Sequence, residues 1–321
     1  MLTPFTNRMH EVIVVVGPTA SGKSTLAQAI AKEIDGEIVS ADSMQVYKGL
    51  DIGTGKVMPD ERVVPHYGLD LVSPDEPYSA ALFQDYSRKC FQLITAKGKT
   101  PILCGGTGFY VRAAIDDYNF PKGEQLNNET RDRCNLFAQQ HGSLALWEKL
   151  QLIDPSSAAI ISPNDTKRVT RAFELLQDGE SYARQKAKLE NIQQLIPSKW
   201  IGLSVDPEIL RARIDARIDR MIEDGLVDEV QSLLDQGLRS SITAAQAIGY
   251  KEIVAALDGE QTLEEAIDQI KTATHKYAKR QRTWFRKEQR ITWIDANDQN
   301  LSSMLSAALS IIREECGGVH A

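Results

Sequence analysis

Residues 12–24 read VIVVVGPTASGKS, a short apolar run that leads directly into the pattern G-x-x-x-x-G-K-[ST]. The β-branched run is typical of a buried parallel strand, and residues 24–34 continue as an amphipathic helix. In such a P-loop the backbone N–H groups converge on a phosphate, the lysine neutralises its charge and the serine hydroxyl ligates Mg²⁺. The alternative is a glycine-rich turn that contains a lysine by chance. Such a turn would not require an apolar strand before it and an amphipathic helix after it. The motif predicts a bound diphosphate or triphosphate, without indicating which molecule carries it, at Gly17, Pro18, Thr19, Ala20, Ser21, Gly22, Lys23 and Ser24.

Outward from this loop, the first 120 residues alternate strand and helix signals. Strand patterns at 37–40 and 101–104 flank a glycine- and proline-punctuated loop region at 48–77 and a helix at 79–97. Alternation of this kind predicts an α/β fold, a P-loop NTPase-like doubly wound parallel sheet with its ligands at the carboxyl ends of the strands.

The pattern then changes to helices alone. Residues 123–197 hold four candidate helices, and residues 199–205 restore a strand pattern. A helix follows at 208–224, and residues 291–294 form the expected last strand. We therefore predict a P-loop catalytic core from residues 1–122 and 198–321, interrupted by an all-helical insertion at 123–197.

Composition narrows the class of protein. Of the 321 residues, 42% are hydrophobic and 25% are charged, which is typical of a globular chain and excludes a wholly disordered one. The four cysteines form no CxxC pair, which disfavours a zinc ribbon or a disulfide framework. With no long apolar segment, we expect a cytoplasmic protein without membrane contact, and we infer no obligate protein partner.

Two strand ends carry candidate catalytic residues. Asp42 follows the second strand in SADS at 40–43, where a carboxylate beside the P-loop is placed to act as a general base; the plainer alternative is a turn cap. The third strand ends in GGTG at 105–108, where a nucleotide hydrolase usually has a metal-binding acid. Thr107 offers a hydroxyl there, and the alternative is a tight turn. The missing acid weakens an ATPase interpretation.

Arginines and lysines gather in two further segments. On the helix at 208–224, one of Arg211, Arg213, Arg217 and Arg220 could reach a leaving pyrophosphate, while most are expected on a solvated face paired with Asp215 and Asp219.

Residues 271–290 hold eight Lys or Arg residues and a single acid, Glu288, in a chain whose net charge is −7. We expect a helix here that presents basic side chains along one face, with Tyr277, Trp284 and Phe285 interleaved. This pattern favours contact with a nucleic-acid backbone over a merely solvated helix. A weaker basic cluster, Lys167, Arg168 and Arg171, lies in the insertion. The predicted basic face comprises Lys276, Lys279, Arg280, Arg286, Lys287 and Arg290.

Taken together, these segments resemble the bacterial-type tRNA dimethylallyltransferases, also called tRNA isopentenyltransferases. The resemblance spans nearly the whole chain, and it departs from many members at Gly55, where they have alanine. It implies transfer of a dimethylallyl group from dimethylallyl diphosphate to N6 of the adenosine immediately 3′ of the anticodon, with release of pyrophosphate. The matching segments are GPTASGKS at 17–24, SADSMQVYKGLDIGTGK at 40–56, PHYGLDLVSPDEPYSAALF at 65–83, ILCGGTGFY at 102–110, NDTKRVTRAFELL at 164–176, QAIGYKE at 246–252 and KRQRTWFRK at 279–287.

The resemblance also implies roles for residues. The P-loop would hold the diphosphate of the isoprenoid. For the reaction itself we expect Mg²⁺ on Ser24 and, among the arginines of residues 211–220, Arg217 at the pyrophosphate. Asp42 would be the base, steered by a hydrogen bond from Thr107, and the insertion at 123–197 would grip the anticodon stem-loop. The implied tRNA contacts are Asp42, Ser43, Met44, Gln45, Arg131, Thr166, Lys167, Arg168, Val169, Thr170, Gln246, Gly249, Lys251, Lys276, Lys279, Arg280 and Arg286.

Two other classes of protein stay open on the residues alone. A small-molecule P-loop kinase would require ATP and would leave the basic helix without a role. A GTPase-like RNA-binding switch would need a guanine-specifying motif such as NKxD, which we do not find. The related adenylate isopentenyltransferases use a free nucleotide and need no helical insertion of this length.

Overall fold

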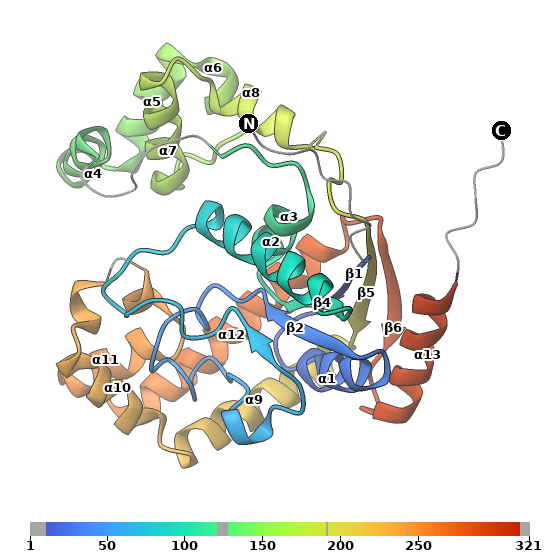
Figure 1. Ribbon diagram of the computed structural model, residues 1–321. Coiled ribbons are helices and arrows are strands. Elements are labelled where there is room, and N and C mark those ends of the chain that lie inside the picture. The colour runs from blue at the N-terminus through green and yellow to red at the C-terminus, as the bar shows by residue number, and fades with distance from the viewer. Residues whose placement is uncertain (1–10, 121–127, 191, 242, 315–321) are drawn as a thin grey trace, which may run out of the picture. The chain divides into compact units, whose positions relative to one another are not determined.

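The computed structural model describes residues 11–120, 128–190, 192–241 and 243–314 (Figure 1). The chain forms two compact units, Met1–Ile115 with Leu195–Ala321, and Asp116–Gln194. Within the described ranges, none of the helices is both long enough and apolar enough to cross a membrane.

A six-stranded parallel sheet forms the centre of the first unit, with the strand order β3-β2-β4-β1-β5-β6. Strand β1 lies between β4 and β5, where Val14 pairs with Leu103 on one side and Trp200 on the other, and all five of its residues are buried. The predicted doubly wound α/β class is confirmed. The strands are β1 (Val12–Val16), β2 (Gly36–Ser40), β3 (His66–Tyr67), β4 (Thr100–Gly105), β5 (Ser198–Ser204) and β6 (Ile291–Asp295).

Helices pack around this sheet, with α1 against α13 and α2 against α3 (Figure 1). Helix α2 begins where the Ser79 side chain accepts a hydrogen bond from the Leu82 N–H, as an N-cap should. The helices of this unit are α1 (Lys23–Glu33), α2 (Ala80–Ala96), α3 (Gly108–Ile115), α9 (Pro207–Glu223), α10 (Leu226–Asp235), α11 (Tyr250–Leu257), α12 (Leu263–Phe285) and α13 (Leu301–Arg313), with 3₁₀ turns at Pro59–Glu61, Leu238–Ser240 and Ala244–Gln246.

The second unit has a separate apolar core. Leu146, Leu150, Val169 and Ala172 are buried in it and do not belong to the core around the sheet. A separate core is what allows a helical segment to be inserted into a sheet protein without disturbing the sheet. Its helices are α4 (Glu129–His141), α5 (Ser143–Ile153), α6 (Pro155–Ala158), α7 (Thr166–Gln177) and α8 (Tyr182–Glu190).

The limits of the two units differ from the predicted 123 and 197. The Val12 N–H donates to the Pro197 carbonyl at 2.9 Å, so Pro197 already belongs to the sheet unit. The N–H groups of Leu195 and Ile196 both donate to the Ile115 carbonyl at 3.0 Å, which brings the two connecting segments together. The predicted first residue of the insertion, at 123, lies outside the described residues.

Three elements differ from the sequence prediction. Strand β3 lies within the predicted loop region at 48–77, and helix α3 begins at the predicted glycine turn. The basic helix α12 ends at Phe285, so Arg286 is its C-cap and the later cations do not continue its face. Arg290 instead pairs with Glu288 at 2.7 Å and lies over the Trp200 ring, 4.3 Å from its centroid.

Candidate active site

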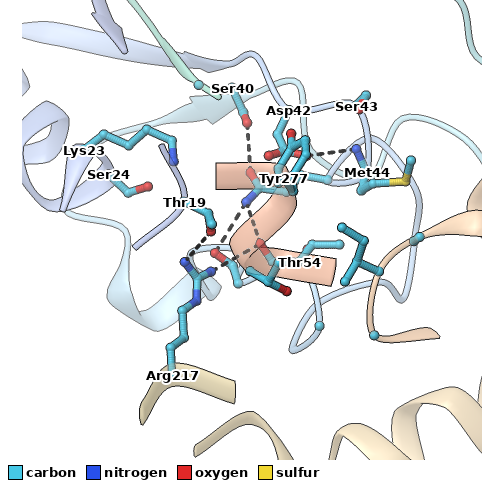
Figure 2. Close-up of a pocket in the computed structure, with 18 of the residues that line it drawn as sticks. Thr19, Lys23, Ser24, Ser40, Asp42, Ser43, Met44, Thr54, Arg217 and Tyr277 are labelled. Atoms are coloured by element: carbon cyan, nitrogen blue, oxygen red, sulfur yellow. Dashed lines mark hydrogen bonds between the residues drawn. The ribbon is translucent and has the colours of Figure 1, made fainter. Parts of the chain in front are cut away.

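A cavity of about 330 Å³ opens at the carboxyl ends of β1, β2 and β4 (Figure 2). Its lining brings together the residues on which the sequence prediction depended: Lys23 and Ser24 from the P-loop, Asp42 after β2, and Arg217 from α9. This is the edge at which a parallel α/β sheet binds its ligands.

The P-loop adopts a compact turn between β1 and α1. Gly22 has φ of +90°, a conformation that glycine adopts without steric cost, and a side chain at Gly17 would come within 2.8 Å of the Ser21 hydroxyl oxygen. Of the eight motif residues, Thr19, Lys23 and Ser24 line the cavity, and the other five shape the turn. The Lys23 ammonium donates to the Pro18 carbonyl at 3.3 Å. Burial lowers the pKa of Lys23, as expected for a cation withdrawn from water.

Arg217 approaches the same space from α9. Its Nη1 donates to Thr19 Oγ1 at 3.2 Å and its Nη2 to the Thr54 carbonyl at 3.5 Å. Burial lowers the pKa of this guanidinium, and the Asp42 charge opposes that shift. Among the described residues, no ion pair joins Lys23 or Arg217 to a carboxylate. Two partly buried cations without ion pairs favour the binding of an anion.

The other charged residues of α9 do not form the predicted pairs. Asp215 pairs with His275 at 2.8 Å and Asp219 with Lys271 at 2.6 Å, both on α12. Arg213 donates to the carbonyls of Ala296 at 2.9 Å and Asn297 at 2.5 Å. The prediction that these arginines pair with Asp215 and Asp219 on their own helix is wrong, because α12 packs against α9 and supplies His275 and Lys271 as the partners.

Asp42 fits both interpretations that the sequence left open. Its Oδ1 accepts a hydrogen bond from the Met44 N–H at 2.9 Å, so it caps the turn, and it also lines the cavity. Thr107 contacts Ser43 rather than Asp42: its Oγ1 accepts from the Ser43 N–H at 3.1 Å and lies 3.4 Å from the Ser43 hydroxyl. The expected hydrogen bond from Thr107 to Asp42 is therefore replaced by an indirect support through the same turn.

Close packing explains the glycines at the end of β4 and directly after it. A Cβ on Gly105 would lie 2.2 Å from the Ala41 carbonyl oxygen, one on Gly106 2.3 Å from Gln281 Nε2, and one on Gly108 2.3 Å from the Trp284 ring. Gln281 and Trp284 belong to α12, so this helix packs directly against the backbone at Gly106 and Gly108. A larger side chain at any of the three glycines would require its neighbours to move.

A loop after β2 forms another part of the cavity wall. The Gln45 amide donates to the carbonyls of Thr54 at 3.2 Å and Gly55 at 3.4 Å and accepts from the Ser40 hydroxyl at 2.8 Å. Gly55 has φ of +59°, and a Cβ there would lie 1.7 Å from Arg217 Nη2, so in this chain the guanidinium occupies the space that an alanine methyl would need.

Glu229 holds the same loop from α10. Its carboxylate accepts hydrogen bonds from the N–H groups of Asp51 at 3.1 Å, Ile52 at 2.7 Å and Gly53 at 3.2 Å, and from the Tyr250 hydroxyl at 2.5 Å. Sequence reasoning missed this support, because nothing near Glu229 in the chain indicates which backbone it contacts.

Tyr277 and Gln281 were also missed as members of the cavity lining. They are four residues apart on α12, and this spacing places them on one helix face. The Tyr277 hydroxyl interacts with Thr107 and Gln281, and burial, together with the Asp42 charge, raises the pKa of Tyr277. The four-residue spacing of Tyr277 and Gln281 is a sequence signal for a shared inner face, whereas the predicted basic side chains lie on the exposed face of the same helix.

Some of the predicted tRNA contacts of the sheet unit line the cavity, and the others lie on the protein surface outside it. Ser43, Met44, Gln45, Gln246 and Gly249 line the cavity, as does Arg280, whose guanidinium carbon lies 5.7 Å from the Tyr277 ring centroid. Lys251, Lys276 and Arg280 line an adjoining open groove on α11 and α12. Lys279 and Arg286 are exposed.

In the insertion unit, the predicted contacts are only partly on the surface. Lys167 and Arg168 are exposed and Thr166 opens α7, but Val169 and Thr170 are 0% and 4% exposed and belong to its inner face. Their side chains therefore cannot contact a partner. Arg131 donates to the buried Glu174 at 2.8 Å, as does Arg171 at 3.0 Å.

The donor set at the P-loop bears on the expected Mg²⁺. Among the described residues, no group of three or more His, Cys, Asp or Glu side chains is arranged to hold a metal ion. The Ser24 hydroxyl and the Asp42 carboxylate line the same cavity. Mg²⁺ usually takes one or two protein oxygens and completes its shell with phosphates and water, so these residues fit a magnesium diphosphate and do not fit a metal held by protein alone.

The chain is similar to known proteins over most of its length. The IPP transferase family model matches residues 45–288, and the isopentenyl transferase model matches residues 10–63. The tRNA dimethylallyltransferase of Bacillus pumilus is 45% identical over 288 residues, 88% of this chain and 89% of that protein. The relative of the same name from Geobacillus thermodenitrificans is 45% identical over 90% of this chain and 91% of its own.

Solved structures are similar over nearly the whole chain. The tRNA delta(2)-isopentenylpyrophosphate transferase of Staphylococcus epidermidis is 37% identical with a TM-score of 0.70, covering 95% of this chain and 100% of that one. A eukaryotic dimethylallyltransferase acting on tRNA is 29% identical with a TM-score of 0.78, covering 94% of this chain and 78% of that one. The P-loop cavity thus lies in a fold shared with these enzymes, and the chain belongs to the IPP transferase family.

Proposed function

We propose that this enzyme transfers a dimethylallyl group from dimethylallyl diphosphate to N6 of the adenosine 3′ of the anticodon in tRNA, releasing pyrophosphate. The observation that carries the proposal is that Lys23, Arg217 and Asp42 line one cavity, so that two cations for an anionic leaving group lie beside one carboxylate for the acceptor.

The exocyclic amine of adenine is a weak nucleophile, because its lone pair is delocalised into the ring. The allylic C–O bond compensates by ionising easily, and its electron pair leaves with the pyrophosphate. Lys23, Arg217 and the P-loop N–H groups stabilise that developing charge, and they are already in place before the reaction.

The new C–N bond forms as N6 loses a proton. Asp42 accepts this proton, and the turn that Asp42 caps is held by the contacts of Thr107 with Ser43. To reach the cavity the adenine must leave its stack, which costs a few kcal/mol and less in a loop than in a duplex.

Mg²⁺ belongs to the proposal as a companion of the diphosphate. The Ser24 hydroxyl would hold it, and the ion would neutralise part of the pyrophosphate charge.

The tRNA is held by exposed cations on both units. On the sheet unit these are Lys276, Lys279, Arg280 and Arg286, and on the insertion they include Lys167 and Arg168. Contacts with the anticodon stem-loop at these positions would be electrostatic and largely independent of sequence.

The test is a reaction without ATP. Pure protein is incubated with dimethylallyl diphosphate, Mg²⁺ and unmodified tRNA. The tRNA is then digested to nucleosides, which are separated and identified by their masses. We expect one adenosine per acceptor tRNA to gain a dimethylallyl group. Lys23→Ala should lower the rate by about 10²- to 10³-fold, while Lys32→Ala, an exposed lysine on the same helix, should not. A reaction that consumes ATP stoichiometrically would contradict the proposal.

A further inference from the structure

Gln281 forms hydrogen bonds with two segments of the active site that are far apart in the sequence. Its Oε1 accepts from the Thr19 N–H in the P-loop at 2.9 Å, and its Nε2 donates to the Gly106 carbonyl after β4 at 3.0 Å. The residue is 5% exposed, and its hydrogen bond to Gly106 is buried while that to Thr19 is partly buried. An amide side chain is well suited to this position, because it carries one acceptor and one donor side by side.

Of the two segments that Gln281 joins, one lies at the leaving diphosphate and the other supports the residue that acts on the acceptor amine. Thr19 lies in the loop that holds the diphosphate, and its hydroxyl accepts from Arg217. Gly106 precedes Thr107, which supports the turn that carries Asp42. Gln281 itself lies on α12, the helix whose exposed lysines face solvent.

Resting on the proposed function, we infer that Gln281 is a positioning residue that sets the distance between the departing diphosphate and the acceptor amine. It also withdraws the Thr19 N–H from phosphate binding, which leaves that task to the amides further along the P-loop. Because a displacement of about 1 Å between reacting groups can cost about 10²-fold in rate, two hydrogen bonds at this point affect the chemical step more than binding.

The test separates binding from the chemical step. Gln281→Met keeps the length of the side chain and removes both of these hydrogen bonds, together with the interaction with the Tyr277 hydroxyl. Its dissociation constants for inorganic pyrophosphate and for tRNA should stay within about threefold of the parent's, while the single-turnover rate constant at saturating substrates falls by about 10²-fold. Gln236→Met, at an exposed glutamine that follows α10, is the matched control and should be unchanged in all three.

A second variant reaches the same contact without altering α12. An added methyl in Gly106→Ala would lie 2.3 Å from Gln281 Nε2 and would displace that amide, so it should show the same loss of rate with both affinities kept. Normal single-turnover rates in both folded variants, or a loss of pyrophosphate affinity that accounts for the whole effect, would overturn the inference. Absence of product with the parent protein would instead refute the proposed function.

Discussion

Replacing Glu229 by Gln tests whether the wall of the cavity is held from α10. In the protein, four hydrogen bonds reach the two oxygens of this carboxylate, three of them from the backbone N–H groups of residues 51–53. Those residues precede Thr54, whose carbonyl accepts from both Gln45 and Arg217. The substitution should therefore loosen the loop at residues 51–54, and the Arg217 guanidinium should become less well positioned as a result.

The magnitude follows from the number of lost acceptors. Glutamine keeps one of the two carboxylate oxygens. The NH₂ group that replaces the second oxygen cannot accept hydrogen bonds from the donors that faced it, the Gly53 N–H and the Tyr250 hydroxyl. The Tyr250 hydroxyl can turn to accept from that NH₂ group, but the Gly53 N–H cannot, and the remaining hydrogen bonds lose the assistance of the charge. Charged hydrogen bonds contribute about 1.5–3 kcal/mol, so we expect the free energy of unfolding to fall by about 2 kcal/mol.

Urea-induced unfolding measures this change, with Asp228→Asn, the exposed acid next to it in the chain, as the control. Affinity for inorganic pyrophosphate, measured by calorimetry, should also decrease, because Arg217 loses a fixed partner. If Glu229→Gln and Asp228→Asn unfold at the same urea concentration and bind pyrophosphate equally well, the reasoning is wrong.

Two further predictions concern the basic helix and the insertion. The double variant Lys276→Ala, Lys279→Ala should reduce the slope of log affinity for tRNA against log salt concentration by about 1.4 to 1.8 and leave the affinity for pyrophosphate unchanged. An unaltered slope would show that these two lysines are solvated and do not contact tRNA phosphates. Burial would raise the pKa of Asp154, but hydrogen bonds from Ser156, Ser157 and Ser181 lower it to about 2 from an ordinary 3.8. Asp154 therefore stabilises the insertion above about pH 4, and that contribution is lost as the pH falls towards 2. Asp154→Asn should cost at most about 2 kcal/mol at pH 7 and little near pH 2, measured by unfolding across that range.

The sequence predicted what depends on short segments of chain. The P-loop, β1 and α1 follow from one continuous pattern, and the position of Asp42 follows from the end of the next strand. Strand β3 could not be predicted, because two residues carry no periodicity and the strand exists only by pairing with β2.

What the sequence did not predict depends on contacts between distant segments. The glycines after β4 were interpreted as a turn, and their reason is helix α12, whose Gln281 lies 175 residues further along the chain. The burial of Val169 and Thr170 was open to prediction, since helical periodicity places Val169 on the apolar face with Ala172. The resemblance matches this segment as a whole and does not separate its buried positions from its exposed ones.

The central claim is that Asp42 takes the proton from the acceptor amine. The variant Asp42→Asn keeps an oxygen to accept from the Met44 N–H, so the turn is retained while the base is lost. Single-turnover rates and tRNA dissociation constants are measured on the same preparations, with the exposed Asp75→Asn as the control. We predict a tRNA affinity close to that of the parent and a rate lower by about 10²- to 10⁴-fold. Loss of tRNA affinity with a normal rate in the bound complex would contradict the claim and assign Asp42 to binding alone.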